Sequence, residues 1–211
     1  VSFDYYPNKR YAFIQFGSKA LELTGGRVAV RQYGLAEVQA QIIDSADYIK
    51  RVMNPDLFGF YKFYNAKKNR REEQLRTIYS ASSLFTLMQV NGVFPHLGYE
   101  KYFRNIANFI LKNQVPSGSN AGAFAYSFNP KTMLPSKRYV VGTASKTIFT
   151  LLLLHAQYPD DTRYLAAARR AGDWLLTRVD DKGQVSPISV CESNPCVENS
   201  RPSLLYSGQV L

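Results

Sequence analysis

The chain has 211 residues, of which 45% are hydrophobic and 20% are charged, a balance that excludes an intrinsically disordered protein. Its 26 Lys and Arg residues against 16 Asp and Glu residues give a formal charge of +10 at pH 7, which favours an anionic partner. The longest apolar run, residues 148–156, is too short and too polar to span a bilayer, so no transmembrane segment is predicted.

Residues 1–34 are interpreted as an N-terminal extension. Within it, Tyr11–Leu23 is predicted to form a short helix that ends at Gly25-Gly26, where glycine permits a left-handed turn. The chain begins with Val1 rather than Met, so a leader could have been removed or left out. Residues 35–211 are predicted to form one repeat domain that consists of three units.

The first predicted unit covers residues 35–98. Apolar residues recur at three- and four-residue steps from Leu35 to Met53, which predicts a helix that ends at Asn54-Pro55. Aromatic residues alternate after Gly59, which predicts a short extended piece rather than free coil. A second helix is predicted from Glu73 to Val90, with Asn91-Gly92 as its stop.

The same plan recurs twice more along the chain. The second unit, residues 99–160, has predicted helices at 99–114 and 139–157 around a linker with alternating aromatics. The third unit, residues 161–211, has a predicted helix at 161–179, capped by Asp161 or Thr162, and a linker at 180–202. A further helix is predicted to open at Ser203, so this last unit is incomplete.

Two of the units align without a gap. Phe60–Asn65 falls on Phe124–Asn129 at a shift of 64 residues, and Leu84–Met88 falls on Ile148–Leu152 at the same shift. Two helices joined by a long linker form an αα-hairpin, and an array of hairpins either stacks into an open superhelix or closes as a double-layered α/α barrel. A repeat of about 60–65 residues is longer than the usual helical solenoid repeats. The fold class predicted is therefore all-α, with hairpins forming part or all of an α/α barrel.

The hairpins resemble those of the α/α-toroid proteins of the six-hairpin glycosidase type. The resemblance lies in the linkers Gly59–Tyr64 and Gly122–Phe128, and in small-residue inner helices such as Thr143–Thr147 and Tyr206–Gln209. It implies a toroid whose relatives include glycoside hydrolases, polysaccharide lyases and sugar epimerases. Such barrels need five to seven hairpins. The chain is therefore a fragment, or assembles with a further chain or as an oligomer, or builds its third hairpin differently.

In a toroid, the ligand lies in a funnel lined by the linkers and by the first turns of the inner helices. Aromatic rings there can stack on the apolar faces of sugars, or can simply pack the linkers against the helix ends. An Arg at the start of an inner helix can hold a carboxylate or phosphate, or can be plain surface charge. The substrate-binding candidates are Tyr61, Tyr64, Arg76, Tyr126, Arg138 and Tyr206.

Catalytic candidates depend on the reaction. A glycosidase needs two carboxylates, and Glu192 and Glu198 stand out because they lie in the longest linker. A lyase or epimerase instead abstracts a proton next to a uronate carboxylate, which an Arg neutralises. Tyr79, one turn into its helix, is a candidate proton donor, or else a core residue.

Cys191 and Cys196 are the only cysteines, and they form either a disulfide or two free thiols. A disulfide would indicate a secreted or periplasmic protein, and free thiols a cytoplasmic one. No metal site is predicted, because both His residues lie far from this cysteine pair.

Nucleotide-binding, nucleophile-elbow and metalloprotease motifs are absent, so no cofactor is predicted. The basic residues occur in scattered pairs and do not form the stripe expected for specific nucleic-acid binding. The sequence therefore predicts a protein that acts on an anionic poly- or oligosaccharide by hydrolysis, lyase cleavage or epimerisation. The alternative is a non-catalytic helical-repeat scaffold that binds protein or an anionic polymer.

Overall fold

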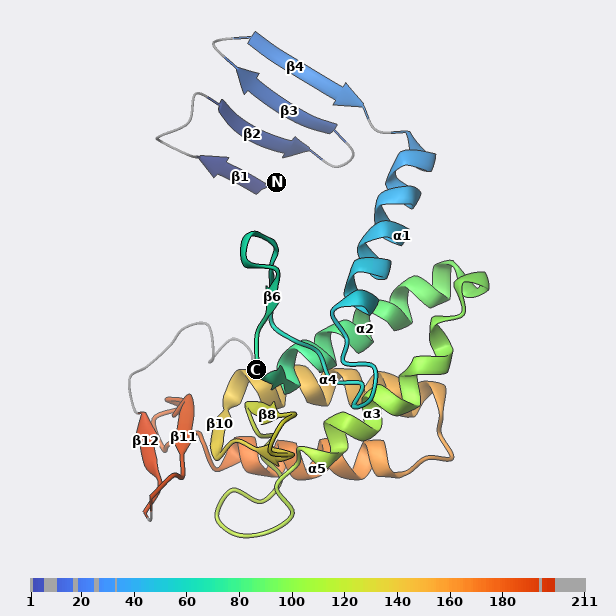
Figure 1. The fold of residues 1–211 in the computed structure, drawn as a ribbon. Helices are drawn as coiled ribbons and strands as arrows, with labels where there is room; N and C mark the ends of the chain where they lie inside the picture. Colours follow the sequence, from blue (N-terminus) through green and yellow to red (C-terminus); the bar gives the residue numbers. More distant parts are fainter. Residues whose placement is uncertain are drawn as a thin grey trace. The chain divides into compact units, whose positions relative to one another are not determined.

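The computed structural model describes residues 2–5, 11–16, 19–24, 27–32, 34–193 and 195–199 (Figure 1). The chain divides into two compact units, Val1–Asp47 and Tyr48–Leu211. Among the described residues, no helix is long and apolar enough to cross a membrane.

The first unit contains a four-stranded antiparallel sheet in the order β1-β2-β3-β4. Its strands are β1 (Ser2–Tyr5), β2 (Tyr11–Phe16), β3 (Lys19–Thr24) and β4 (Arg27–Gln32). The helix predicted over Tyr11–Leu23 is therefore wrong. Leu21 and Leu23 alternate with Glu22 and Thr24, which is the period of a strand, and the register pairs Leu21 with Val30 and Leu23 with Val28.

Helix α1 (Leu35–Arg51) follows the sheet and ends close to its predicted boundary. Asn54 provides the reason for the stop. Its side-chain oxygen accepts hydrogen bonds from the backbone N–H groups of Asp56 and Leu57. These bonds close a turn that contains Pro55. The chain then enters the first linker of the second unit.

The helices of the second unit pack against one another in pairs. Helices α2 (Thr77–Val93) and α4 (Val141–Gln157) pack side by side, α3 (Phe103–Lys112) packs on α2, and α5 (Arg163–Leu176) packs on α4. The Thr150 hydroxyl of α4 donates to the Ala81 carbonyl of α2 at 3.1 Å, so these two helices approach each other closely. The largest fully buried side chains are Phe60, Leu75, Leu84, Leu87, Phe103, Ile106, Ile110, Phe124, Phe128, Leu151, Tyr164 and Trp174.

Helix α2 differs at both ends from its prediction. It begins four residues later than Glu73 because Leu75–Arg76 forms a short strand, β7, that pairs with β8 (Ser127–Asn129). It also runs through Asn91-Gly92 to Val93. Phe94 follows the last helical residue, and its N–H still bonds to the Val90 carbonyl. The helix stops there because Pro95 has no N–H to donate.

The first two linkers form the same hairpin. In the first, β5 (Tyr64–Asn65) pairs with β6 (Arg70–Arg71), with Tyr64 opposite Arg71 and Asn65 opposite Arg70. In the second, β8 pairs with β9 (Leu134–Pro135), with Phe128 opposite Pro135 and Asn129 opposite Leu134. Each pair of the second hairpin lies 64 residues beyond its counterpart in the first. The extended pieces predicted from alternating aromatics are confirmed.

The third linker follows the same path with other residues. Backbone bridges join Met53 to Phe60, Gln114 to Phe124, and Val179 to Val185. Val185 is thus the buried counterpart of the two aromatic rings. Beyond it, β11 (Ile188–Val190) pairs with β10 (Arg138–Val140) and with β12 (Val197–Asn199). The helix predicted from Ser203 lies outside the described residues.

Candidate functional site

Three of the predicted site residues meet where α2 and α4 begin. Arg76 directly precedes α2, Arg138 precedes α4, and Tyr126 lies in the second linker between them. The Cζ atom of Arg76 lies 4.7 Å from the centroid of the Tyr126 ring, and that of Arg138 lies 4.9 Å from the same centroid. Both distances are within the range of a cation–π interaction. We name these three residues the Arg–Tyr–Arg cluster.

Backbone hydrogen bonds hold the cluster together. The Tyr126 N–H donates to the Arg138 carbonyl at 2.8 Å, and the Tyr126 carbonyl accepts from the Thr77 N–H at 3.4 Å. Arg76 stands opposite Ser127 in the pairing of β7 with β8. The second linker therefore joins the starts of both inner helices, and its aromatic side chain lies at their junction.

The two arginines have different surroundings. Arg76 forms an ion pair with Glu72, and the two side chains are only 17% and 13% exposed. Glu72 also accepts a hydrogen bond from the Lys62 N–H at 3.1 Å, so this pair ties the first linker to α2. The exposed Arg138, in contrast, has no acidic partner within the described part of the chain. Its fork of N–H donors is therefore available to an anionic ligand.

Glu192 interacts electrostatically with Tyr139, the residue that follows Arg138. Burial raises the pKa of Tyr139, and the negative charge of Glu192 raises it further. The Tyr139 hydroxyl is therefore protonated at neutral pH. The exposed Glu192 carboxylate follows Cys191, whose N–H donates to the Lys137 carbonyl at 2.8 Å. Tyr139 was not among the predicted site residues, although its place directly after Arg138 is a signal that could have found it.

A disulfide joins Cys191 to Cys196 and fastens this loop to the helical core. The side-chain amide of Asn120 donates to Cys191 Sγ at 3.2 Å and approaches Cys196 Sγ at 3.6 Å. The Asn120 carbonyl oxygen accepts from the indole N–H of the buried Trp174 at 3.0 Å. The disulfide is thus linked through Asn120 to helix α5.

Glu198 has a different partner. It lies in β12 and forms an ion pair with Arg178 at 2.7 Å, and Arg178 lies 5.7 Å from the Trp174 ring centroid. Glu192, in contrast, acts electrostatically on Tyr139. In the described part of the chain, no shared partner unites the two carboxylates.

The remaining candidates lie outside the cluster. The Tyr61 hydroxyl accepts a hydrogen bond from the Asn54 side chain at 3.0 Å, and its ring lies under Arg71. Tyr79 is 38% exposed in the first turn of α2. For Tyr64 the structure describes the backbone only, in β5 opposite Arg71. Tyr206 lies outside the described residues.

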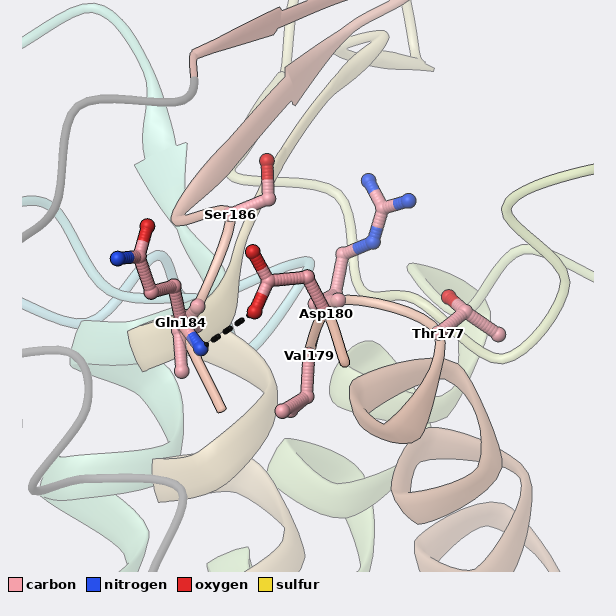
Figure 2. Close-up of a pocket in the computed structure, with 7 residues that line it drawn as sticks. Thr177, Val179, Asp180, Gln184 and Ser186 are labelled. Atoms are coloured by element: carbon pink, nitrogen blue, oxygen red, sulfur yellow. Dashed lines mark hydrogen bonds between the residues drawn. The ribbon is translucent and has the colours of Figure 1, made fainter. Parts of the chain in front are cut away.

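A pocket lies where the third linker leaves α5 (Figure 2). Its carboxylate, Asp180, already accepts hydrogen bonds from the N–H groups of Lys182 and Gln184, at 3.0 and 2.7 Å. Its volume of ≈ 230 Å³ is below the roughly 300–1,000 Å³ of typical ligand sites. The pocket is therefore a feature of the turn itself. Its lining residues are Thr177, Arg178, Val179, Asp180, Gln184, Val185 and Ser186.

The sequence matches no protein-family model and no curated protein. Solved structures do match it. Two are cellobiose 2-epimerases, from Bacillus thermoamylovorans B4167 and Spirochaeta thermophila DSM 6192, at 13% and 15% identity and a TM-score of 0.64 each. They cover 82% and 83% of this chain, which covers 46% and 47% of theirs. An alpha-amylase from Clostridium perfringens matches at 15% identity and a TM-score of 0.62, over 83% of this chain and 49% of its own.

These similarities show the fold and confirm that the chain has αα-hairpins of the α/α-toroid type. The chain spans about half the length of the solved structures that it matches. The named structures belong to carbohydrate-active enzymes. Sequence identities this low support a shared fold but not a shared reaction.

Proposed function

We propose that this α/α-toroid chain acts on an anionic oligo- or polysaccharide, and that Arg138 binds a carboxylate of the sugar. The observation that carries the proposal is the difference between the two arginines of the cluster. Arg76 is neutralised by Glu72, whereas Arg138 is exposed beside the Tyr126 ring with no acidic partner in the described part of the chain. A planar guanidinium next to an aromatic ring suits a uronate, which has a charged group and an apolar face.

Glu192 is the residue we assign to proton transfer. It is a carboxylate on the same loop segment that bonds to Lys137, next to Arg138, and its charge contributes to raising the pKa of Tyr139. In this arrangement Arg138 neutralises the uronate carboxylate, Glu192 accepts the adjacent proton, and the Tyr139 hydroxyl can donate one. Tyr79, exposed in the first turn of α2, remains a second candidate proton donor.

Lyase cleavage or epimerisation fits this geometry better than hydrolysis. A glycosidase requires two carboxylates on opposite sides of the scissile bond. Glu198, the second candidate, is engaged by Arg178. A lyase or epimerase needs only one base near a carboxylate-binding arginine, and we assign these two roles to Glu192 and Arg138.

The proposal is tested by screening the full-length protein against uronate-containing oligosaccharides and their neutral counterparts. Glu192→Gln should lower turnover at least about a hundredfold, the loss expected when a positioned general base is removed. Arg138→Gln should raise KM for the uronate substrate. The control is Lys131→Gln, an exposed cation of the second hairpin, which should leave turnover unchanged. Normal turnover by Glu192→Gln, or binding of these glycans with no turnover of any of them, would contradict the proposal, and the second result would support a scaffold.

A further inference from the structure

The first linker hairpin carries a concentration of positive charge that the cluster does not use. Between residues 62 and 71 the chain has five cations and no carboxylate: Lys62, Lys67, Lys68, Arg70 and Arg71. All five are exposed. Figure 1 shows this β5–β6 hairpin projecting from the helices near the start of α2.

The second hairpin shows that the fold does not need these charges. At the shift of 64 residues, Lys68 corresponds to Thr132, Arg70 to Leu134 and Arg71 to Pro135. The β8–β9 hairpin nevertheless has the same strand register as β5–β6. Of the four cations between residues 67 and 71, only Lys67 has a basic counterpart, which is Lys131. The extra charge is therefore not required to form the hairpin.

The cations differ in how far the hairpin itself uses them. Arg71 donates to the Arg51 carbonyl at 3.2 Å and lies over the Tyr61 ring, so it has a structural role. Lys67 and Arg70 form no ion pair within the part of the chain that the structure describes. These two charges can be changed without breaking a contact of the hairpin.

A groove runs along the hairpin and has the composition of a glycan site. Its volume is ≈ 370 Å³, within the roughly 300–1,000 Å³ of ligand sites. It contains the ring of Phe63, which is 49% exposed, beside three of the cations. Of its two carboxylates, Glu72 pairs with Arg76, whereas the exposed Glu73 lies 4.0 Å from the exposed Lys131. The residues that line it are Phe63, Lys68, Arg70, Arg71, Glu72, Glu73 and Gln74.

The groove and the cluster are connected through one side chain. Glu72 lines the groove and binds Arg76 of the Arg–Tyr–Arg cluster. Arg76 lies five positions after Arg71, so the chain between them spans at most about 18 Å. A single extended ligand can therefore contact both places.

We propose that the β5–β6 hairpin binds further units of an acidic polysaccharide whose uronate is held at Arg138. The proposal rests on the function proposed above and narrows its substrate class, from any anionic sugar to a polyanionic chain. Phe63 stacks on the apolar face of a sugar ring, while Lys67 and Arg70 attract its carboxylates. Each contact is exposed, so the binding is weak per unit and decreases with added salt.

The test compares polygalacturonate, galacturonate and the polynucleotide poly(U) as ligands of the full-length protein. The variant is the double substitution Lys67→Gln with Arg70→Gln. The control is Arg169→Gln, an exposed cation of α5 that does not line the groove. The variant should bind polygalacturonate about three- to tenfold more weakly, the loss expected for two exposed charge pairs, with a shallower salt dependence. Galacturonate binding should be unchanged in the variant, and both affinities should be unchanged in the control.

Three results would overturn the proposal. They are an unchanged affinity of the double variant for polygalacturonate, an equal loss in Arg169→Gln, and tighter binding of poly(U) that depends on the same two cations. Failure of the carboxylate site is distinguishable. In that case Arg138→Gln leaves galacturonate binding unchanged, while the hairpin variant still weakens binding of the polymer.

Discussion

Asn69 and Met133 lie 64 residues apart and share a left-handed backbone conformation, with φ angles of 45° and 59°. Asn69 lies in the turn between β5 and β6, and Met133 lies in the turn between β8 and β9. The two linkers therefore repeat a turn geometry as well as a strand register. Their side chains at this position differ, and only one of them suits it, because Asn tolerates the left-handed region and Met does not.

Met133→Asn should stabilise the protein. The substitution places in the second hairpin the residue that the first hairpin already has, at an exposed position where little packing is lost. The free energy of unfolding should rise by about 0.5–1 kcal/mol. The left-handed conformation destabilises a non-glycine residue by roughly 1–2 kcal/mol, and it destabilises Asn by less. Urea denaturation at equilibrium measures the change. A decrease in stability would show that Met133 makes contacts that outweigh its backbone strain.

Gly122→Ala should destabilise the second linker. Gly122 has a φ of 90°, and a Cβ added there would lie 2.1 Å from the Arg170 carbonyl oxygen of α5. We expect a loss of at least about 1–3 kcal/mol, the cost of strained backbone, together with a displacement of α5. Gly92→Ala in α2 is the control, since nothing lies within 4 Å of the added Cβ. It should raise stability by about 0.5–1 kcal/mol. Equal effects of the two substitutions would contradict the close approach at Gly122.

Replacing both cysteines, Cys191→Ser with Cys196→Ser, should lower the free energy of unfolding by about 2 kcal/mol, the loop-entropy value for so short a loop. Because Asn120 links the disulfide to Trp174, the only tryptophan, fluorescence should also report the change in the folded state. Reduction of the wild-type protein should reproduce both effects. An unaltered stability together with an unaltered emission spectrum would show that the loop is held without the disulfide.

Asp161 should make stability depend on pH in the acid range. A hydrogen bond from the Arg163 side chain, opposed by burial, lowers the pKa of Asp161 from 3.8 to about 2. A lowered carboxyl pKa means that the stabilisation is complete above pH 3.8 and is lost as the pH falls towards 2. Asp161→Asn should therefore lose less stability than wild type between pH 6 and pH 2. Its exposed neighbour provides the control, and Asp160→Asn should behave as wild type. A wild-type pH dependence in Asp161→Asn would contradict the ion pair with Arg163.

Much of the second unit could be predicted from sequence because its signals are periodic. The apolar spacing located α2, α3, α4 and α5, and Phe60 and Phe124, which lie 64 residues apart in the two repeats, are both buried. Helix boundaries were less accurate. Glu73–Arg76 has no local feature that excludes a helix, and only the pairing of Arg76 with Ser127 shows that this stretch is extended.

The N-terminal helix prediction failed for a different reason. Tyr11–Phe16 has apolar residues at nearly every position, and such short runs fit a helix and a strand equally well. The site shows the same limit. Arg76 and Arg138 were predicted at the starts of the inner helices, but the ion pair of Arg76 with Glu72 distinguishes their roles, and a list of residue types does not contain it.

The most direct test of the account is the binding of galacturonate and of its neutral counterpart galactose, measured by calorimetry on wild type, Arg138→Gln and Arg76→Gln. We predict that wild type prefers galacturonate and that Arg138→Gln loses this preference, about tenfold or more, since a charge-assisted hydrogen-bonded pair is removed. Arg76→Gln should instead lower stability and retain the preference, because its charge is already paired with Glu72. A wild type that does not distinguish the two sugars, or an Arg138→Gln variant that still prefers galacturonate, would contradict the account.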